Sequence, residues 1–495
     1  MNGFVTLVGA GPGDPGLLTV KGRQAIEHAE VVVYDALVGD GIMALIPDDA
    51  ELINVGKRSG NHTVPQEGIN QILVDKAREG KRVVRLKGGD PFLFGRGGEE
   101  LEELHAAGVP FQEVPGVTSA ISAPAYAGIP VTHRDFASSV HIITGHKKAG
   151  KELGIDFEAL VRTGGTLVFL MGVSALPEIC AGLMAGGMAP DTPASIVERG
   201  STPHQRRVDA TVSTLAEKAV AEHVKAPAIS VFGGVCSLGD KLDWFDQLAL
   251  KGKRIAVTRP KERIGTLSTR LRALGADVIE YPCIETRPIV PCAPMEEALG
   301  QLQNYDWLAL TSPAGAQYLW EELRREGKDA RALAGLKIAA IGPGTAGVLA
   351  KHGLQADYIP EVYDAAHLGA GLVKLGARNV VMFRADIGTP ELPETLLASY
   401  VSYLDVAIYE TVYTSPCADS LRPQLENSEI DMVTFTSAST VKGFVDSLGQ
   451  DFDFTKVTAV CIGIQTEAEA KKYGMRTHVA EKATLDAMIE TMRSM

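Results

Sequence analysis

The 495-residue chain has few cysteines and few aromatic residues, and it carries no excess of basic charge. Its six cysteines are scattered, without a CxxC pair or neighbouring histidines, so we predict no metal site and no disulfide framework. The formal net charge of −13 disfavours nucleic acid or an anionic membrane as a partner. The longest nearly uncharged apolar stretch, around 179–189, is too short to cross a bilayer, and no secretion leader is visible. Together these absences predict a cytoplasmic protein.

Apolar runs that alternate with helical patterns predict an α/β fold with largely parallel sheets. The length is too great for one core, so several compact units are expected. We place the main boundary after residue 248, which gives two domains, 1–248 and 249–495. The first domain is expected to form two lobes, of about 1–135 and 136–248.

The second domain contains a weak internal repeat, in which a strand ends in Thr-Ser or Ile-Gly and turns directly into a helix. The paired segments are 305–323 with 430–448, and 337–360 with 457–480. Two similar lobes are therefore predicted, one of about 253–286 plus 414–495 and the other of about 295–408. Helix N-termini at the carboxyl ends of their strands would offer free N–H groups to an anionic ligand.

The glycine-rich loop GAGPGDP at 9–15 follows the first predicted strand. Together with Gly16 it fits G-x-G-x-x-G, and Asp35 stands where a ribose-binding carboxylate would be expected. Pro12 and Pro15, however, remove two backbone donors that a pyrophosphate would use. A nicotinamide-dependent dehydrogenase is therefore a disfavoured alternative.

Further glycine-rich loops follow later predicted strands, in LKGGDPFLFGRGGEE (86–100) and VPGVTSA (114–120). Gly88 and Gly89 would let a ligand approach the backbone closely, and Asp90 adds a carboxylate. Each glycine alone is explained by a turn, but several such loops after strands favour one shared ligand pocket. Solvated surface charge is the alternative explanation for the basic residues that are candidates to bind a polyanionic substrate, which are Lys57, Arg58, Arg85, Lys87, Arg96, His133 and Arg134.

The order and spacing of the motifs in the first half carry a resemblance to a known family. GAGPGDP, VVYDALV, VGKRSG, VVRLKGGDPFLFGRGGEE, VPGVTSA, AYAGIPVTHRD, TGH, FLMG and VERGST follow one another as in uroporphyrinogen-III C-methyltransferases. The resemblance covers roughly 3–245. These enzymes belong to the tetrapyrrole methylases, whose two-lobed α/β fold holds S-adenosylmethionine between the lobes.

This resemblance implies a set of site residues. It implies a proton acceptor at Asp35 and a proton donor at Lys57. A carboxylate can accept the proton that the methylated ring must lose, although Asp35 could instead cap a helix and Lys57 could bind a substrate carboxylate. Leu93 stands where relatives often carry Ile or Val. The implied cofactor-binding residues are Pro12, Gly88, Gly89, Asp90, Leu93, Thr118, Ser119, Met171, Gly200 and Ala228.

Residues 253–495 resemble uroporphyrinogen-III synthases. The resemblance rests on IAVTRP, the doubled Thr-Ser and Ile-Gly pattern, and VVMFRADIGTPELPETL followed by VAIYETVY. It suggests that Tyr409 is a proton donor, while a strand aromatic packed at a lobe junction is the alternative. Helix caps would equally explain most of the residues expected at the cleft, which are Thr311, Ser312, Arg384, Ser437, Ser439 and Thr466.

Together the two resemblances predict a bifunctional enzyme. The second half would convert hydroxymethylbilane to uroporphyrinogen III, and the first would transfer two methyl groups from S-adenosylmethionine to give precorrin-2, for sirohaem or cobalamin. No segment remains for a dehydrogenase–chelatase, and a homodimer through the methylase half is implied. The alternatives are a non-catalytic two-lobe binding module in the second half and a methylase that acts on a later corrin intermediate or a diphthamide precursor.

Overall fold

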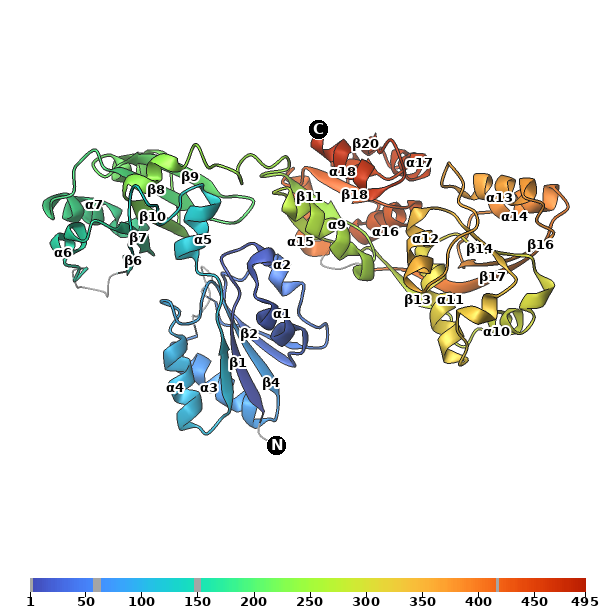
Figure 1. Cartoon of the computed structure of the whole chain (residues 1–495), viewed down its shortest axis with the longest axis horizontal. Coiled ribbons are helices and arrows are strands. Elements are labelled where there is room, and N and C mark those ends of the chain that lie inside the picture. Colours follow the sequence, from blue (N-terminus) through green and yellow to red (C-terminus); the bar gives the residue numbers. More distant parts are fainter. Residues whose placement is uncertain (1–2, 57–63, 147–152, 415–417) are drawn as a thin grey trace. The chain divides into compact units, whose positions relative to one another are not determined.

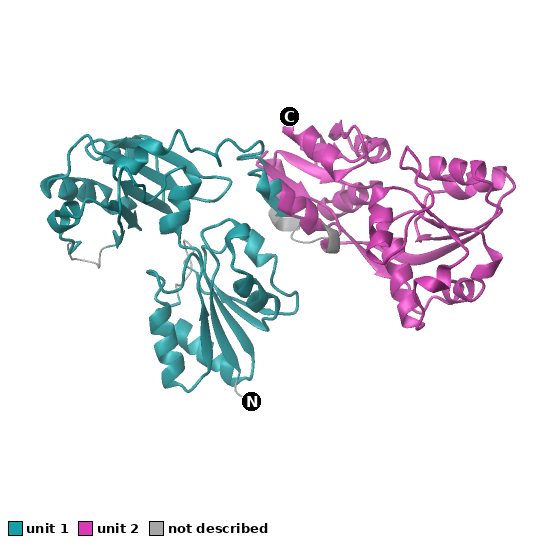
Figure 2. Cartoon of the chain, in the orientation of Figure 1, with its two compact units in different colours: residues 1–253, 271–279 teal, residues 254–270, 280–495 magenta. Residues whose placement is uncertain are grey.

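The computed structural model describes residues 3–56, 64–146, 153–414 and 418–495 (Figure 1). The chain forms two compact units (Figure 2). Unit 1 comprises residues 1–253 and 271–279, and unit 2 comprises 254–270 and 280–495. Within the described residues, no helix is both long and apolar enough to cross a membrane.

The first sheet of unit 1 has the order β3-β2-β4-β1-β5, and all of its neighbouring strands are parallel. Its strands are β1 (Phe4–Gly9), β2 (Val31–Tyr34), β3 (Glu51–Asn54), β4 (Arg82–Lys87) and β5 (Phe111–Val114). The associated helices are α1 (Val20–Glu27), α2 (Asp40–Met43), α3 (Gln66–Arg78) and α4 (Gly97–Ala106), with a 3-10 turn η1 (Pro15–Leu17). Strands β1 and β2 read as nearly continuous apolar runs because both faces of the sheet are covered at its centre.

The second sheet of unit 1 has the order β6-β7-β10-β8-β9. Its strands are β6 (Val140–Thr144), β7 (Thr166–Leu170), β8 (Pro193–Glu198), β9 (Arg206–Thr211) and β10 (Ala228–Phe232). Its helical segments are α5 (Ser119–Tyr126), α6 (Phe157–Arg162), η2 (Val173–Ala175), α7 (Leu176–Ala185), α8 (Leu215–Ala221) and η3 (Gly234–Leu238). Only β6 and β7 pair in parallel, and the other three pairs are antiparallel.

The antiparallel pairing in this second sheet differs from the largely parallel arrangement expected for the first half. The pair β8 and β9 shows the reason, because residues 199–205 join these strands without a helix. A connection that short can reverse the chain but cannot cross over to a parallel neighbour.

Two further five-stranded sheets, ordered β12-β11-β18-β19-β20 and β13-β17-β16-β14-β15, are built largely from unit 2. The first is built from β11 (Arg254–Val257), β12 (Asp277–Glu280), β18 (Met432–Phe435), β19 (Thr458–Cys461) and β20 (Arg476–Val479). The helical segments beside it in the chain are α9 (Lys261–Ala273), α15 (Ala418–Glu426), α16 (Ala438–Leu448), η6 (Phe454–Lys456), α17 (Ile464–Lys472) and α18 (Leu485–Arg493).

The second sheet of unit 2 is built from β13 (Ile284–Pro288), β14 (Trp307–Leu310), β15 (Lys337–Ala340), β16 (Asn379–Ala385) and β17 (Ser402–Tyr413). Its helical segments are α10 (Ala293–Gly300), η4 (Leu302–Asn304), α11 (Pro313–Arg325), η5 (Ala330–Leu333), α12 (Pro343–Lys351), α13 (Ala365–Lys374) and α14 (Glu391–Ala398). Strand β13 pairs antiparallel with β17. Residues 284–286, expected in the other lobe, therefore belong to this sheet.

The internal repeat corresponds to equivalent elements of the two sheets in unit 2. The repeated segments form β14–α11 and β15–α12 in one sheet, and β18–α16 and β19–α17 in the other. In each sheet the two repeated strands are parallel neighbours.

The five cysteines in the described part of the chain are all buried. Burial raises the pKa of the Cys180 thiol to about 11 and those of Cys236, Cys283 and Cys461 to about 12. Thiolate is the reactive form, so a Cys417→Ser variant is expected to show no rapid reaction with a chromogenic disulfide reagent at pH 8. The thiols should react once the protein is unfolded, and rapid labelling of the native variant would contradict this burial.

Candidate functional site

A large cavity lies at the carboxyl edge of the parallel sheet in unit 1. Loops after β1, β2 and β4 supply one wall, because parallel strands end at the same edge of a sheet. These loops contribute residues 11–15, 35–41 and 87–90 to the lining. The cavity has a volume of about 1180 Å³, which is more than one drug-sized ligand needs.

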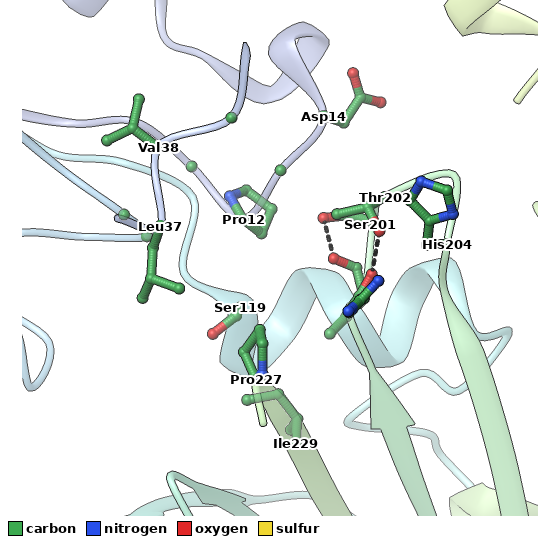
Figure 3. Close-up of a pocket in the computed structure, with 18 of the residues that line it drawn as sticks. Pro12, Asp14, Leu37, Val38, Ser119, Ser201, Thr202, His204, Pro227 and Ile229 are labelled. Carbon is green, nitrogen blue, oxygen red and sulfur yellow. Dashed lines mark hydrogen bonds between the residues drawn. The ribbon is translucent and has the colours of Figure 1, made fainter. Parts of the chain in front are cut away.

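The opposite wall comes from the start of α5 and from the second sheet. It includes Thr118 and Ser119, Met171 after β7, residues 199–203 after β8, and residues 226–229 at the start of β10. In Figure 3, Pro12 and Leu37 lie across the cavity from Ser119, Pro227 and Ile229. A ligand here would contact both sheets of unit 1.

All ten residues expected to bind the cofactor line this cavity, and so does Asp35. The ten come from six separate stretches of sequence that the fold brings together: Pro12; Gly88, Gly89, Asp90 and Leu93; Thr118 and Ser119; Met171; Gly200; and Ala228.

Asp35 lies directly after β2, and its side chain is 27% exposed. One carboxylate oxygen accepts a hydrogen bond from the Leu37 backbone N–H at 3.3 Å. The other lies 3.7 Å from a guanidinium nitrogen of the buried Arg85. The N-cap of α2 is Gly39, so Asp35 does not cap that helix. The carboxylate is therefore placed in the cavity with access to solvent.

In unit 2, the phenol of Tyr409 meets the hydroxyl of Ser312 at 2.8 Å. Ser312 caps α11, where its Oγ accepts a hydrogen bond from the Gly315 N–H at 2.9 Å. Tyr409 is on β17, is buried to 6% exposure, and has its ring centroid 5.5 Å from that of Tyr318. The tyrosine thus has both aromatic packing and a hydroxyl contact at a helix N-terminus.

Two family models match the chain, one for each half. The model for tetrapyrrole (corrin/porphyrin) methylases matches residues 5–216, and the model for uroporphyrinogen-III synthase HemD matches 265–490. The porphyrin biosynthesis protein HemD of Ruminiclostridium josui is 48% identical over 493 residues, which are 99% of this chain and 98% of that protein. The chain belongs to this family of fused methylase–synthase proteins.

Other similar proteins match the methylase half. Siroheme synthase 3 of Aeromonas hydrophila is 54% identical over 245 residues, which are 50% of this chain and 52% of that protein. A crystal structure of the uroporphyrin-III C-methyl transferase of Thermus thermophilus with S-adenyl homocysteine is 43% identical, covering 48% of this chain and 99% of that one, with a TM-score of 0.42. The methylase–synthase is thus a bifunctional enzyme of tetrapyrrole biosynthesis.

The local structure of the methylase cavity fits a nucleoside-containing cofactor. Gly89 has φ +69°, and a Cβ added there would meet no atom within 4 Å, so a ligand can approach this backbone. The carboxylate of Asp90 accepts hydrogen bonds from the N–H groups of Phe92, Leu93 and Gly116, which fixes the loop. Among the described residues, the Ser119 hydroxyl makes no hydrogen bond and lies in the cavity wall (Figure 3).

Close packing of Gly116 against this loop leads to a first prediction for the site. A Cβ at Gly116 would lie 2.2 Å from the carbonyl oxygen of Gly89, whereas one at Gly98 would meet no atom within 4 Å. Overpacking typically costs about 1–3 kcal/mol, so Gly116→Ala is expected to weaken S-adenosylhomocysteine binding about tenfold, measured by calorimetry. Gly98→Ala is the matched control, and equal affinities in the two variants would refute the tight approach.

Of the basic residues expected to bind substrate, Lys87 lines the cavity, whereas Arg96, His133 and Arg134 do not, and Arg85 is buried outside the lining. Arg96 forms a two-point ion pair with Glu99, at 2.9 and 2.6 Å. The His133 ring accepts a hydrogen bond from the Asp135 N–H at 3.2 Å, and Arg134 is exposed. Lys57 and Arg58 lie outside the described residues.

Backbone strain marks cavity residues that the sequence analysis did not single out. Phe94, Met171, Arg199 and Ser201 have positive φ, and all four line the cavity. Of these, only Met171 was expected at the site. Such conformations cost roughly 1–3 kcal/mol each and concentrate at ligand sites. These positions could not be predicted from the sequence, because no simple residue pattern marks a non-glycine residue with positive φ.

Among the predicted site residues of the synthase half, Ser312 and Tyr409 come from different segments and meet through their hydroxyl groups. Ser437 caps α16, and its Oγ is 2.9 Å from that of Ser439. Thr311 is half-buried after β14, and Thr466 is buried on α17. Arg384 forms a two-point ion pair with Asp405 and donates a hydrogen bond to the Thr389 carbonyl.

Proposed function

We propose that the synthase half converts hydroxymethylbilane to uroporphyrinogen III. We further propose that the methylase half transfers two methyl groups from S-adenosylmethionine to that product to give precorrin-2, for sirohaem or cobalamin. The division of the chain into residues 1–248 and 249–495, and a homodimer through the methylase half, are parts of the same proposal.

The observation that carries the methylase proposal is the convergence of the ten cofactor positions and Asp35 on one cavity. A carboxylate beside a cofactor cradle can accept the proton that a methylated pyrrole ring must lose. The volume of about 1180 Å³ is enough for a large second ligand beside a nucleoside.

The sulfonium supplies an activated methyl group, and the enzyme has mainly to hold the acceptor carbon in line with it. The 88–90 loop and the strained segments around Met171 and Arg199 would hold the two ligands in this alignment. When the ring carbon takes the methyl group, the ring becomes cationic and then loses a proton. We assign acceptance of that proton to Asp35, which is ion-paired and partly exposed.

In the synthase half, ring closure begins with loss of a hydroxyl group from the bilane, which protonation assists. We assign that proton to the Tyr409 hydroxyl. The hydrogen-bonded unit of Tyr409, Ser312 and the N-terminus of α11 supports this role, because helix N–H groups favour the developing negative charge on the oxygen.

The direct test is anaerobic incubation of the full chain with hydroxymethylbilane, with and without S-adenosylmethionine, followed by chromatography and mass spectrometry. Uroporphyrinogen III without the cofactor and a dimethylated product with it are expected. Formation of only the type I isomer, which arises without the synthase, would leave the second half as a binding module. Failure to methylate supplied uroporphyrinogen III would refute the methylase proposal.

A further inference from the structure

A cluster of buried charges lies behind the methylase cavity and includes Glu100, to which no role has been assigned. Arg85 and Lys87 on β4 and Glu100 on α4 are 3%, 5% and 0% exposed. One oxygen of Glu100 accepts hydrogen bonds from Lys87 Nζ at 2.8 Å and Arg85 Nε at 3.2 Å. The same oxygen accepts a third from Gln66 Nε2 at 3.1 Å. Glu100 is not among the cavity-lining residues, so its carboxylate serves the cluster rather than a ligand.

Glu100 fixes the guanidinium that faces Asp35. Arg85 donates from Nε to Glu100 and from Nη1 to the carbonyls of Val33 and Leu86. These contacts leave its Nη2 at 3.7 Å from the Asp35 carboxylate. Removal of Glu100 would free the Arg85 side chain from one of its anchors, and Asp35 would lose a fixed partner.

Glu100 also favours the charged form of Lys87. Burial and the neighbouring Arg85 cation lower the pKa of Lys87, and the carboxylates of Glu100 and Asp35 oppose that change. Glu99 on the same helix is a further, exposed carboxylate close enough to interact with Lys87. Lys87 precedes the Gly88–Gly89–Asp90 loop and contributes to the cavity lining.

The cluster has two positive charges, on Arg85 and Lys87, and two negative charges, on Asp35 and Glu100. This balance holds only while Asp35 is ionised. When Asp35 accepts the proton released by the methylated ring, the cluster gains a net positive charge in a poorly solvated region, where unbalanced charge is costly. Because the side chain is 27% exposed, the proton can pass from Asp35 to water, which restores the carboxylate.

We propose that Glu100 and Lys87 are positioning residues for methyl transfer, which hold Arg85 against Asp35 and keep the cluster balanced so that Asp35 returns to its ionised form after each transfer. This inference rests on the proposed role of Asp35 in the methylase half.

The test compares Lys87→Met, Glu100→Gln and the double variant in the full-length protein, with saturating uroporphyrinogen III and S-adenosylmethionine. Each single variant should lower kcat about tenfold or more, because misplacement of a reacting group is costly. In the double variant, the positive charge of Arg85 and the negative charge of Asp35 remain and balance each other. Its kcat should therefore exceed that of Lys87→Met. Glu103→Gln, at an exposed position on the same helix, is the matched control and should leave kcat unchanged.

The pH dependence of kcat gives a readout that a purely structural role would not change. In Glu100→Gln, Lys87 loses the two interactions with Glu100 that oppose the lowering of its pKa. The lysine then loses its proton at lower pH, so the alkaline limb of kcat should move to lower pH in Glu100→Gln. That movement should be absent from the double variant, in which residue 87 does not titrate.

Unchanged kcat in both single variants would overturn the inference. So would a double variant whose kcat is reduced by the two single fold-losses multiplied together, or by more. Each variant must bind S-adenosylhomocysteine with an affinity within about twofold of that of the original protein. This requirement separates a change in kcat from misfolding. The unmodified protein could methylate uroporphyrinogen III while Asp35→Ala does not. If the Lys87 and Glu100 variants then keep the original kcat, only this inference fails. If the unmodified protein does not methylate uroporphyrinogen III, the proposed function itself fails.

Discussion

Replacement of Asp35 by alanine is expected to lower the rate of methylation by about 10²- to 10⁴-fold, the range that one positioned general base contributes. Ring closure by the same molecules should keep its original rate, because Asp35 lies in unit 1 and the synthase residues lie in unit 2. Both rates can be measured on one preparation, with supplied uroporphyrinogen III for methylation and hydroxymethylbilane for ring closure.

Asp35→Asn is the matched variant for this experiment. The amide oxygen can still accept the hydrogen bond from the Leu37 N–H, so the local backbone is retained while the proton acceptor is lost. We expect Asn and Ala to be similarly inactive, with S-adenosylhomocysteine affinity preserved in both. An active Asn variant would show that Asp35 only orders the loop, and loss of both activities would indicate misfolding or a wrong division of the chain.

The sequence could predict the methylase site because the contributing residues follow strands whose order sets their position. Pro12, Asp35 and Gly88 lie in the loops that follow β1, β2 and β4, which end at one edge of a parallel sheet. Met171 and Ala228 could be added only through the family resemblance, because they come from a different sheet.

The contacts made by individual charged side chains could not be predicted in the same way. Glu100 belongs to an acidic stretch that is typical of an exposed helix, but α4 packs so that this residue is completely buried against Arg85 and Lys87. Arg384 was expected to face a ligand, and instead Asp405 on the neighbouring strand β17 pairs with it. Such choices depend on helix rotation and strand register, which charge patterns do not determine.

The second large expected effect concerns Tyr409 in the synthase half. If its phenol donates the proton that assists loss of the bilane hydroxyl, Tyr409→Phe should slow ring closure by about 10²-fold or more. Methylation of supplied uroporphyrinogen III should be unchanged. Phenylalanine retains the ring that packs against Tyr318 and loses only the hydroxyl that meets Ser312.

The same variant distinguishes catalysis from packing, because the two roles predict different measurements. A tyrosine that only packs would leave the ring-closure rate intact, and the unfolding free energy would fall by about 0.5–1.5 kcal/mol through the lost hydrogen bond with Ser312. Tyr403→Phe is the matched control, since Tyr403 is on the same strand and is 37% exposed. A slow Tyr409→Phe enzyme beside a normal Tyr403→Phe enzyme would locate the effect in the Ser312–Tyr409 unit. Equal ring-closure rates in both variants would show that Tyr409 only packs in the core of its lobe. The proton donor would then have to lie elsewhere in the synthase half.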